Sequence, residues 1–312
     1  MGESALLTTI CLNPALDRTV TVDAFRPGAV NRIRDSRTDV GGKGVNVALV
    51  CRRLGLAVQV LGCAGASGAD TVRAALETEG AAHAFLTVDG AVRVNTKIVS
   101  LDGFAVTELN EPGAALTGQD RADFFALAAE RTRGSDFAVI TGSLPPGCPP
   151  DTYRRLIEAL SPVRCILDVS GAALREGVKA RPFLIKPNQQ ELAETLGREV
   201  HTLEDVCEAA RSFVEAGVRH VVVSMGGDGA FYLGEAGCFR APAIPVTVHS
   251  TVGAGDAMIG GILHGLMTHG TMREALRAGV AAGTASVMTE GTQLIRPQDF
   301  KRLLEQVRIQ EL

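Results

Sequence analysis

Short and almost wholly apolar segments recur through the second half of the 312-residue chain, and they constrain its fold more than any other feature. Such uninterrupted runs are typical of strands buried on both faces of a parallel sheet. Helix-like stretches separate them. This alternation predicts crossover units and an α/β layered fold with a mostly parallel central sheet and helices on both sides. The runs are Phe137–Ile140, Cys165–Asp168, Phe183–Lys186 and His220–Ser224.

The segment between the last two runs carries the signals of one complete helix. Thr202 offers a hydroxyl cap, and Asp205 follows three residues later as an acid that completes a capping box. Apolar residues then recur at helical spacing, and Gly217 is a typical helix stop. The sequence therefore predicts a helix from about 202 to 217.

Two regions depart from this rhythm because polar and apolar residues alternate along them. They cover about 18–39 and 92–110. Alternation gives a strand one wet face and one covered face, which is typical of antiparallel strands outside a buried parallel sheet. The two regions are distant in sequence but can pair into a small accessory sheet. We therefore interpret residues 1–312 as a single domain that carries a discontinuous β lid.

Composition argues against several classes of function. Hydrophobic residues make up 46% of the chain and charged residues 21%, which is ordinary for a globular enzyme. The formal net charge is −4 without a basic block, so no nucleic-acid partner is expected. No apolar run approaches the ~20 residues that cross a bilayer. The opening residues 1–18 lack the basic start of a signal peptide, and we interpret them as a first strand.

The seven cysteines are scattered and show neither CxxC pairs nor a spacing typical of metal ligands. This usage indicates small core residues in a reducing, cytoplasmic compartment.

The strongest chemical signal is the segment STVGAGDAM at 250–258, which an apolar helix follows. Gly253 and Gly255 allow a tight bend, so the N–H groups around Ala254 form a hollow at the positive end of that helix. Such a hollow binds anions. Asp256 beside it would repel an anion, but it suits a base that takes a proton from a hydroxyl attacking a phosphate. The alternative is an aspartate that only helps to cap the helix.

A second glycine-rich turn, GGKGVN at 41–46, opens another helix. Its glycines let a ligand approach the main chain, and Lys43 and Asn46 offer donors from the same turn. Taken alone, the turn could equally be a tight connection between a strand and a helix. It is not a Walker motif, because the spacing G-x4-G-K-[ST] is absent.

Together the two motifs resemble the signature regions of the ribokinase-like (PfkB) carbohydrate kinases, as GGKGVNVALVCRRLG (41–55) and STVGAGDAMIGGIL (250–263). The resemblance covers essentially the whole chain and implies a three-layer α/β/α fold with a small antiparallel β lid. The segments NPALD, EPGAAL and GSLPPG resemble the branch of the family that phosphorylates phosphosugars. Further segments in the family's order are NPALD (13–17), GSLPPG (142–147), LIKPNQQE (184–191) and VSMGGDGA (223–230).

The resemblance also implies roles for individual residues, with ATP and Mg²⁺ as nucleotide and metal. Asp256, kept ionised by the helix N-terminus, would be the catalytic base beside the hollow at 253–255. Asn188 and Glu191 would order Mg²⁺ through water, because this ion retains much of its hydration. The phosphate already on the sugar would be held by Arg32, Lys43 and Arg93, since arginine binds phosphate with two parallel hydrogen bonds. The sugar site would comprise Asp17, Gly42, Lys43, Asn46 and Asn95, and the nucleotide site Lys186, Asn188, Glu191, Ser224, Gly226 and Gly229.

For Arg32 and Arg93, the alternative is a solvated residue on a β-ribbon. The apolar outer faces of the lid would need cover, which the lid of a second subunit could supply. We therefore expect a homodimer with no membrane partner.

The acceptor is open between three ketohexose phosphates. NPALD, VNRIR and GGKGVNV in the first 50 residues favour fructose 1-phosphate, and tagatose 6-phosphate and fructose 6-phosphate are the alternatives. A kinase for an unphosphorylated sugar is disfavoured by Arg93 and NPALD. A catalytically silent sugar-phosphate sensor is disfavoured because Asp256 and the loop glycines are all present.

Overall fold

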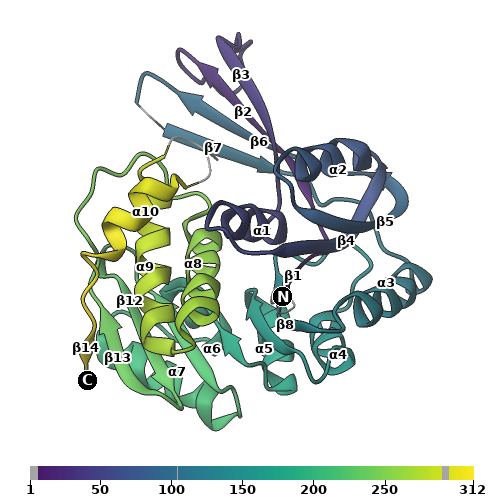
Figure 1. Cartoon of the computed structure of the whole chain (residues 1–312). Helices are drawn as coiled ribbons and strands as arrows, with labels where there is room; N and C mark the ends of the chain where they lie inside the picture. Colours follow the sequence, from purple (N-terminus) through teal and green to yellow (C-terminus); the bar gives the residue numbers. More distant parts are fainter. Residues whose placement is uncertain (1–5, 104, 290–294) are drawn as a thin grey trace.

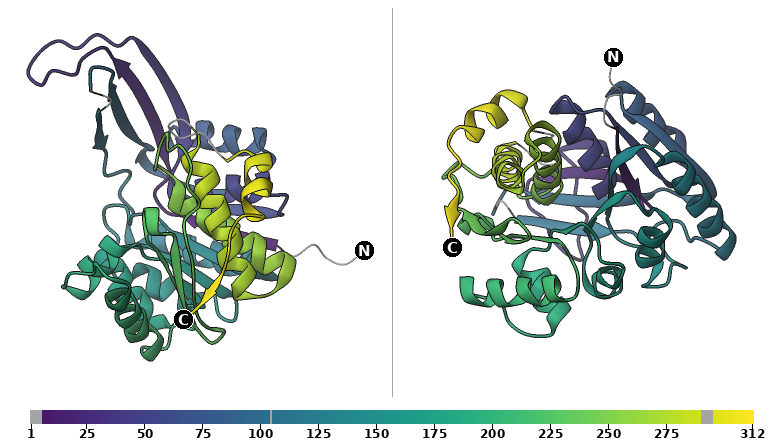
Figure 2. Two further views of the ribbon diagram at one scale, coloured as in Figure 1. Left: turned by 90° about the vertical axis from the view of Figure 1, so that its left-hand side faces the viewer. Right: turned by 60° about the horizontal axis from the view of Figure 1, so that its bottom comes forward.

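The computed structural model describes residues 6–103, 105–289 and 295–312 of the chain. They form a central sheet of ten strands between two layers of helices (Figures 1 and 2). This confirms the predicted three-layer α/β/α fold. The strands of the central sheet are β1 (Leu6–Cys11), β4 (Val58–Ser67), β5 (Ala82–Ala91), β8 (Ser135–Thr141), β9 (Arg164–Asp168), β10 (Leu184–Ile185), β11 (His220–Ser224), β12 (Ala230–Gly234), β13 (Gly237–Ala241) and β14 (Gln310–Glu311).

The strand order is β14-β13-β12-β11-β10-β9-β8-β1-β4-β5. All pairings from β11 to β5 are parallel, and β12, β13 and β14 extend the sheet as an antiparallel edge. The four apolar runs predicted as strands are β8, β9, β10 and β11, so that prediction is confirmed. The predicted first strand is β1, while residues 1–5 lie outside the described residues.

Helices cover both faces of the central sheet because its strands are apolar on both sides. Along β8, Phe137 and Val139 join one buried cluster, and Ala138 and Ile140 join the other. None of the helices in the described ranges is long and apolar enough to cross a bilayer. One layer comprises α1 (Lys43–Arg53), α2 (Ala69–Thr78), α8 (Ala254–His269), α9 (Met272–Val287) and α10 (Pro297–Leu304). The other comprises α3 (Gly118–Arg131), α4 (Thr152–Ala159), α5 (Gly171–Gly177), α6 (Gln189–Leu196) and α7 (Leu203–Glu215).

The predicted helix between β10 and β11 is α7. Thr202 caps its N-terminus and forms a reciprocal capping box with Asp205. The chain leaves the helix through Gly217, whose φ of 101° lies in the region that favours glycine. The capping signals in the sequence therefore located both ends of this helix.

A four-stranded accessory sheet extends from the core beside α1 and α2 (Figure 1). It consists of two antiparallel hairpins, as the alternating segments predict, and the hairpins join through a parallel pairing of their inner strands. The first hairpin is inserted between β1 and α1, and the second between β5 and α3. The strands are β2 (Ala15–Val22), β3 (Asp35–Gly41), β6 (Arg93–Ser100) and β7 (Ala105–Asn110), in the order β3-β2-β6-β7.

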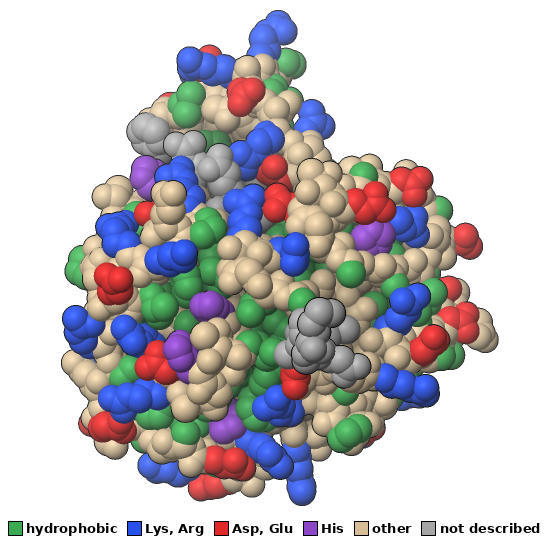
Figure 3. All heavy atoms as spheres, in the orientation of Figure 1, with side chains coloured by type: hydrophobic (Ala, Val, Ile, Leu, Met, Phe, Trp, Pro, Cys, Tyr) green, Lys and Arg blue, Asp and Glu red, His purple; other side chains and the backbone are tan. Residues whose placement is uncertain are grey.

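The first strand of this sheet begins at Ala15, a little before the predicted boundary at 18, and residues 23–34 form the turn at its far end. On the face of the molecule shown in Figure 3, lysine and arginine side chains are dispersed among acidic ones.

Candidate active site

Helix α8 begins at the second glycine-rich motif. Gly253 has a φ of 78° and turns the chain into the helix, whose first residues are Ala254, Gly255 and Asp256. The first N–H groups of a helix have no acceptor within it, and the helix dipole makes this end positive. Asp256 lies in this first turn with a side chain that is only 5% exposed. An anion-binding helix end and a buried carboxylate are therefore adjacent, as the sequence predicts.

Burial raises the pKa of Asp256 to about 6, against the opposing influence of Lys43 and of a hydrogen bond from Asn46. That hydrogen bond runs 2.8 Å from Nδ2 of Asn46 to Oδ2 of Asp256. The neighbouring carboxylate of Asp168 raises the pKa further. The sequence predicts that the helix N-terminus keeps Asp256 fully ionised. Burial outweighs that influence and raises the pKa of this carboxyl above its ordinary value. A base is most effective with a pKa near the working pH, so Asp256 is poised for proton transfer.

Asp168, at the end of β9, belongs to the same centre and was not singled out from the sequence. Its side chain is buried, with Oδ1 3.2 Å from Nζ of Lys186 and Oδ2 4.0 Å from Nζ of Lys43. Burial alone would raise the pKa of Asp168, but the two lysines hold it below its ordinary value. A carboxylate at the carboxyl end of a parallel strand is the signal that could have identified it.

Lys43 is the first residue of α1, and its ammonium lies among acidic groups. Nζ is 3.9 Å from Oε1 of Glu191, and the charge of Asp168 is the main cause of a raised pKa of Lys43. Lys186 is buried, and its ammonium contacts the first turn of α8 near Gly255. Two lysines and three carboxylates therefore meet at the N-terminus of α8.

Asn188 and Glu191 form the capping box of α6. The side chain of Asn188 accepts a hydrogen bond from the N–H of Glu191, and Oε2 of Glu191 accepts one from the N–H of Asn188. This leaves Oε1 of Glu191 facing Lys43. No group of three or more His, Cys, Asp or Glu side chains in the described residues could hold a metal ion by itself.

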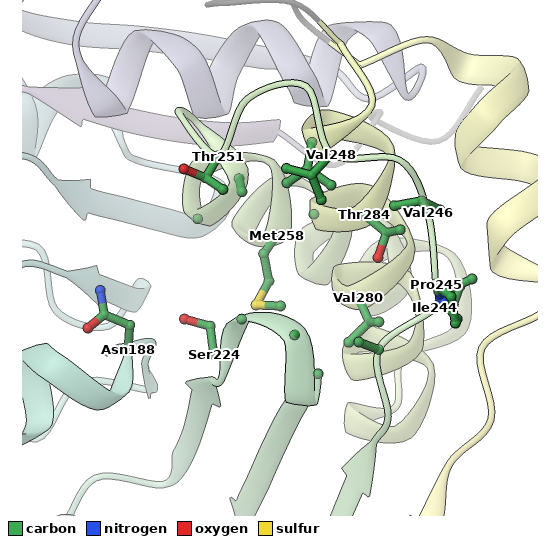
Figure 4. Close-up of a pocket in the computed structure, with 18 residues that line it drawn as sticks. Asn188, Ser224, Ile244, Pro245, Val246, Val248, Thr251, Met258, Val280 and Thr284 are labelled. Carbon is green, nitrogen blue, oxygen red and sulfur yellow. The ribbon is translucent and has the colours of Figure 1, made fainter. Parts of the chain in front are cut away.

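A pocket of about 550 Å³ opens beside this centre (Figure 4). Asn188, Ser224 and Thr251 lie toward one end of it and Met258 lies in the middle, while the far end is mostly apolar with Thr284 among its side chains. Four of the six residues predicted to bind nucleotide line this pocket, namely Asn188, Ser224, Gly226 and Gly229, whereas Lys186 and Glu191 belong to the charged centre. The apolar end comprises Ile244, Pro245, Val246, Val248, Val280 and Val287.

The pocket depends on a tight turn after β11. Gly229 has a φ of 93°, and a Cβ atom at this position would lie 2.0 Å from the carbonyl oxygen of Ala241. Only glycine fits there.

The glycine turn before α1 faces the base of the accessory sheet. Asp17 on β2 lies against Gly41, where an added Cβ atom would be 2.3 Å from Oδ2. Asn95 on β6 is in register with Asp17 and donates a hydrogen bond of 2.9 Å from Nδ2 to Oδ1. Gly42 has a φ of 100° and packs against Cys11 and Pro14, so the turn lies tightly on the end of β1. Asp17, Asn95 and the turn therefore form one polar surface.

The structure does not bring the three predicted phosphate-binding residues together. Arg93 lies at the base of the accessory sheet and donates a hydrogen bond of 3.1 Å to the carbonyl oxygen of Asn13. Arg32 is exposed in the turn at the other end of β2, and the eight residues of that strand separate the two ends by roughly 23 Å. Lys43 is directed to the acidic centre. Within one chain, Arg93 is the member of this set that lies beside the Asp17–Asn95 pair.

Comparison with known proteins decides the family. The profile described as "pfkB family carbohydrate kinase" matches residues 11–299. The chain belongs to the PfkB carbohydrate kinase family. It is therefore a carbohydrate kinase, that is, a phosphotransferase.

Relatives of this PfkB kinase match along almost its whole length. It is 39% identical to the 1-phosphofructokinase of Rhodobacter capsulatus, over 98% of each chain. It is 33% identical to the 1-phosphofructokinase of Bacillus subtilis, over 98% of this chain and all of that one. Among solved structures, phosphofructokinase-2 from Escherichia coli superposes with a TM-score of 0.92 at 31% identity, over 97% of this chain and 99% of that one. The same E. coli enzyme has also been solved in complex with fructose-6-phosphate, with a TM-score of 0.90.

Proposed function

We propose that this PfkB kinase is a 1-phosphofructokinase, which transfers the γ-phosphate of ATP to fructose 1-phosphate and forms fructose 1,6-bisphosphate and ADP. The observation that carries the kinase chemistry is the buried Asp256 at the N-terminus of α8, between the pocket and the sugar-facing turn. The relatives named 1-phosphofructokinase, at 33% and 39% identity, support the choice of acceptor.

In this proposal Asp256 accepts the proton of the attacking sugar hydroxyl. Phosphoryl transfer depends mainly on positioning and on stabilising negative charge, so a base can take the proton late. The N–H groups of Gly255 and Asp256 face the phosphoryl group as it moves. Lys43 and Lys186 add positive charge at the same point, and Asp168 holds both of them there.

ATP occupies the pocket beside α8 in this proposal. Its base lies among the apolar side chains at the far end, and its phosphates extend past Ser224 and Asn188 to the first turn of α8. The glycines at 226 and 229 let the main chain approach the nucleotide closely. The mostly apolar lining suits the flat faces of a purine.

The residues at the mouth of the pocket fit a Mg²⁺ ion bound together with the nucleotide. Mg²⁺ prefers oxygen ligands and keeps several waters, and in kinases phosphate oxygens supply much of its coordination. Oε1 of Glu191 is the carboxylate oxygen that the capping box does not use and lies 3.9 Å from Nζ of Lys43, and Asn188 lines the pocket. When bound, the ion neutralises charge on the phosphates. Asn188 and Glu191 would hold it, largely through water.

The sugar lies on the polar surface of Asp17, Asn95, Gly42 and Asn46. Ionised Asp17 accepts hydrogen bonds from sugar hydroxyls. Arg93, beside this pair, contributes to binding the phosphosugar.

We also propose that two chains associate through their accessory sheets. Large apolar side chains are exposed on this sheet and on its distal turn, which is unusual for a surface that stays uncovered. Val106 and Leu109 lie on opposite faces of β7, and a C₂ dimer would use the same edge of the sheet on both chains. Phosphofructokinase-2 from E. coli, with which this chain shares its fold, has been solved in a tetrameric form. The exposed residues are Val30, Ile33, Val106 and Leu109, with exposures of 51–88%.

Fructose 6-phosphate is the second candidate acceptor, since the E. coli phosphofructokinase-2 structure contains that sugar and superposes closely. The deciding experiment is a comparison of kcat/KM for fructose 1-phosphate, fructose 6-phosphate and tagatose 6-phosphate at one salt and Mg²⁺ concentration. We expect fructose 1-phosphate to be preferred. A preference for either 6-phosphate would refute the assignment of the acceptor and leave the kinase chemistry intact.

A further inference from the structure

One face of the accessory sheet carries a row of polar side chains from its two inner strands. Residues two apart along a strand point to the same side, so Arg93, Asn95 and Lys97 of β6 share this face. The hydrogen bond between Asn95 and Asp17, which are in register, places Asp17 and Thr19 of β2 on it as well. This face contains the Asp17–Asn95 pair to which we assign the sugar.

The row begins at the glycine turn and runs away from it along the strands. Asp17 lies against Gly41, just before Lys43 and the catalytic centre. Lys97 lies further out, in register with Thr19 on β2 and with Glu108 on β7. A ligand that reacts at Asp256 and lies on the Asp17–Asn95 pair can therefore extend toward Lys97.

Several polar atoms of this row are covered but lack partners within the described residues. Oδ1 of Asn95 and Oγ1 of Thr19 are buried without a hydrogen bond. Lys97 is only 7% exposed as a residue, and no side chain in the described ranges forms an ion pair or hydrogen bond with its ammonium, including the exposed Glu108 opposite. Its Nζ is not among the fully covered atoms, so the ammonium is accessible from this face. Covered polar atoms without partners, such as Oδ1 of Asn95 and Oγ1 of Thr19, are costly. Their grouping on one face indicates a ligand with hydroxyls and a negative charge.

Resting on the proposed function, we propose that Lys97 binds the phosphate that the ketohexose already carries. An ammonium and phosphate oxygens form strong charge-assisted hydrogen bonds, and Oγ1 of Thr19 provides a neighbouring hydroxyl for the same group. Oδ1 of Asn95 accepts a hydrogen bond from the sugar. Arg93, on the other side of the pair, already donates to the carbonyl oxygen of Asn13, which leaves Lys97 as the cation of the row without a protein partner.

The test compares Lys97→Met and Lys97→Arg with the matched control Glu108→Gln. Isothermal titration calorimetry measures the affinity for fructose 1-phosphate, fructose 6-phosphate and tagatose 6-phosphate, and steady-state kinetics measures KM for the sugar and for ATP. For the sugar that the unchanged protein binds best, Lys97→Met should weaken binding about ten- to hundredfold, as expected for a lost hydrogen bond to a charged group. The KM for ATP should be unchanged, and the melting temperature should not fall. Lys97→Arg should restore most of the affinity, and Glu108→Gln should bind like the unchanged protein.

Two results would overturn the role of Lys97. One is an unchanged sugar affinity in Lys97→Met. The other is an equal loss of affinity and of melting temperature in Lys97→Met and Glu108→Gln, because this would make the two residues a structural pair. A failure of the proposed function is distinguishable, since the unchanged protein would then neither bind nor phosphorylate any of the three sugars.

Discussion

A hydrogen bond of 2.8 Å from Nδ2 of Asn46 to Oδ2 of Asp256 joins the first turn of α1 to the first turn of α8. The two glycine-rich turns are far apart in sequence, and each begins one of these helices. The bond therefore holds the two glycine-rich turns in one arrangement. It also orients the carboxylate that we assign as the base.

Replacing Asp256 with Asn should nearly abolish turnover and should stabilise the free protein. The amide oxygen can still accept the hydrogen bond from Asn46, but it cannot take a proton, and a general base contributes ~10²–10⁴-fold in rate. In the folded protein Asp256 binds its proton more tightly than in the unfolded chain, so its ionisation lowers stability as pH rises from about 4 through 6. The change from 3.8 to about 6 corresponds to roughly 3 kcal/mol at pH 7.

A coupled assay of ADP release checks the loss of turnover. Thermal unfolding at pH 7 checks the change in stability. A variant that keeps more than about a tenth of the rate would remove Asp256 as base, given the size of the expected loss. A large fall in melting temperature would show that the carboxylate supports the fold.

In a plot of kcat/KM against pH, the fall in activity on the acid side should have its midpoint near the pKa of Asp256, about 6. Lys43 lowers the pKa of Asp256 and Asp168 raises it. Lys43→Met should therefore move the midpoint to higher pH, and Asp168→Asn should move it to lower pH. Both variants will be slow, but the position of the midpoint does not depend on the absolute rate. Shifts of the same sign in the two variants would contradict the assignment of the limb to Asp256.

Arg93→Ala should raise KM for the phosphosugar and leave KM for ATP nearly unchanged. Losing a hydrogen bond to a charged group costs ~1.5–3 kcal/mol, which is roughly ten- to a hundredfold. Arg93 lies beside the Asp17–Asn95 pair and does not line the pocket assigned to ATP. Steady-state kinetics with each substrate varied in turn provides the measurement. Equal effects on both substrates would show that Arg93 does not contact the sugar.

Gly283 on α9 offers a way to obstruct the nucleotide pocket alone. A Cβ atom at this position would make ordinary contacts with Ala254 and Met258, so Gly283→Ala should be nearly silent. The longer side chain of Gly283→Leu would enter the pocket. The added side chain takes space that the nucleotide would fill, so KM for ATP should rise about ten- to hundredfold, which is roughly 1.4–2.8 kcal/mol of binding free energy, while the affinity for the sugar is kept. If both variants bind ATP normally, the nucleotide lies elsewhere.

The proposed dimer can be tested with a charge placed on the accessory sheet. Leu109 and Leu312 are both 57% exposed, but only Leu109 belongs to that sheet. Leu109→Glu should shift the protein from dimer to monomer, because a buried carboxylate without a partner is costly. Leu312→Glu, with equal exposure, should leave the mass unchanged. Light scattering coupled to gel filtration gives the mass, and a dimeric Leu109→Glu protein would exclude this edge of the sheet from the contact.

Much of the fold could be predicted from local patterns. Continuous apolar runs such as Phe137–Ile140 can only be buried on both faces, which requires the layered architecture. Thr202 and Asp205 set the start of α7 through their own side chains. The parallel pairing of β2 with β6 could not be predicted, because alternation tells which face of a strand is covered but neither its partner nor its direction.

The site was predictable where glycine-rich motifs mark it, as at Asp256. Asp168 was missed because it is a single acid at a strand end, and its meaning arises only when packing brings two lysines to it. The sequence suggests that Arg32 and Arg93 bind the same phosphate, because both are arginines on lid segments. It does not reveal that the length of β2 separates them. A ligand-binding role for Lys97 could not be predicted, because a lysine in an alternating β-ribbon has the pattern of a solvated residue.

The residues that line the pocket proposed for ATP all come from 188–287, whereas those on the surface proposed for the sugar come from 17–97. On this proposal, separate stretches of one polypeptide bind the two reactants, and these stretches meet at Asn46 and Asp256. Each stretch can diverge as long as that meeting point and the close packing of α1 on α8 at Val50 and Gly260 are kept. A chimaera that takes its first hundred residues from a relative with another acceptor should inherit that relative's sugar preference and retain its own nucleotide site.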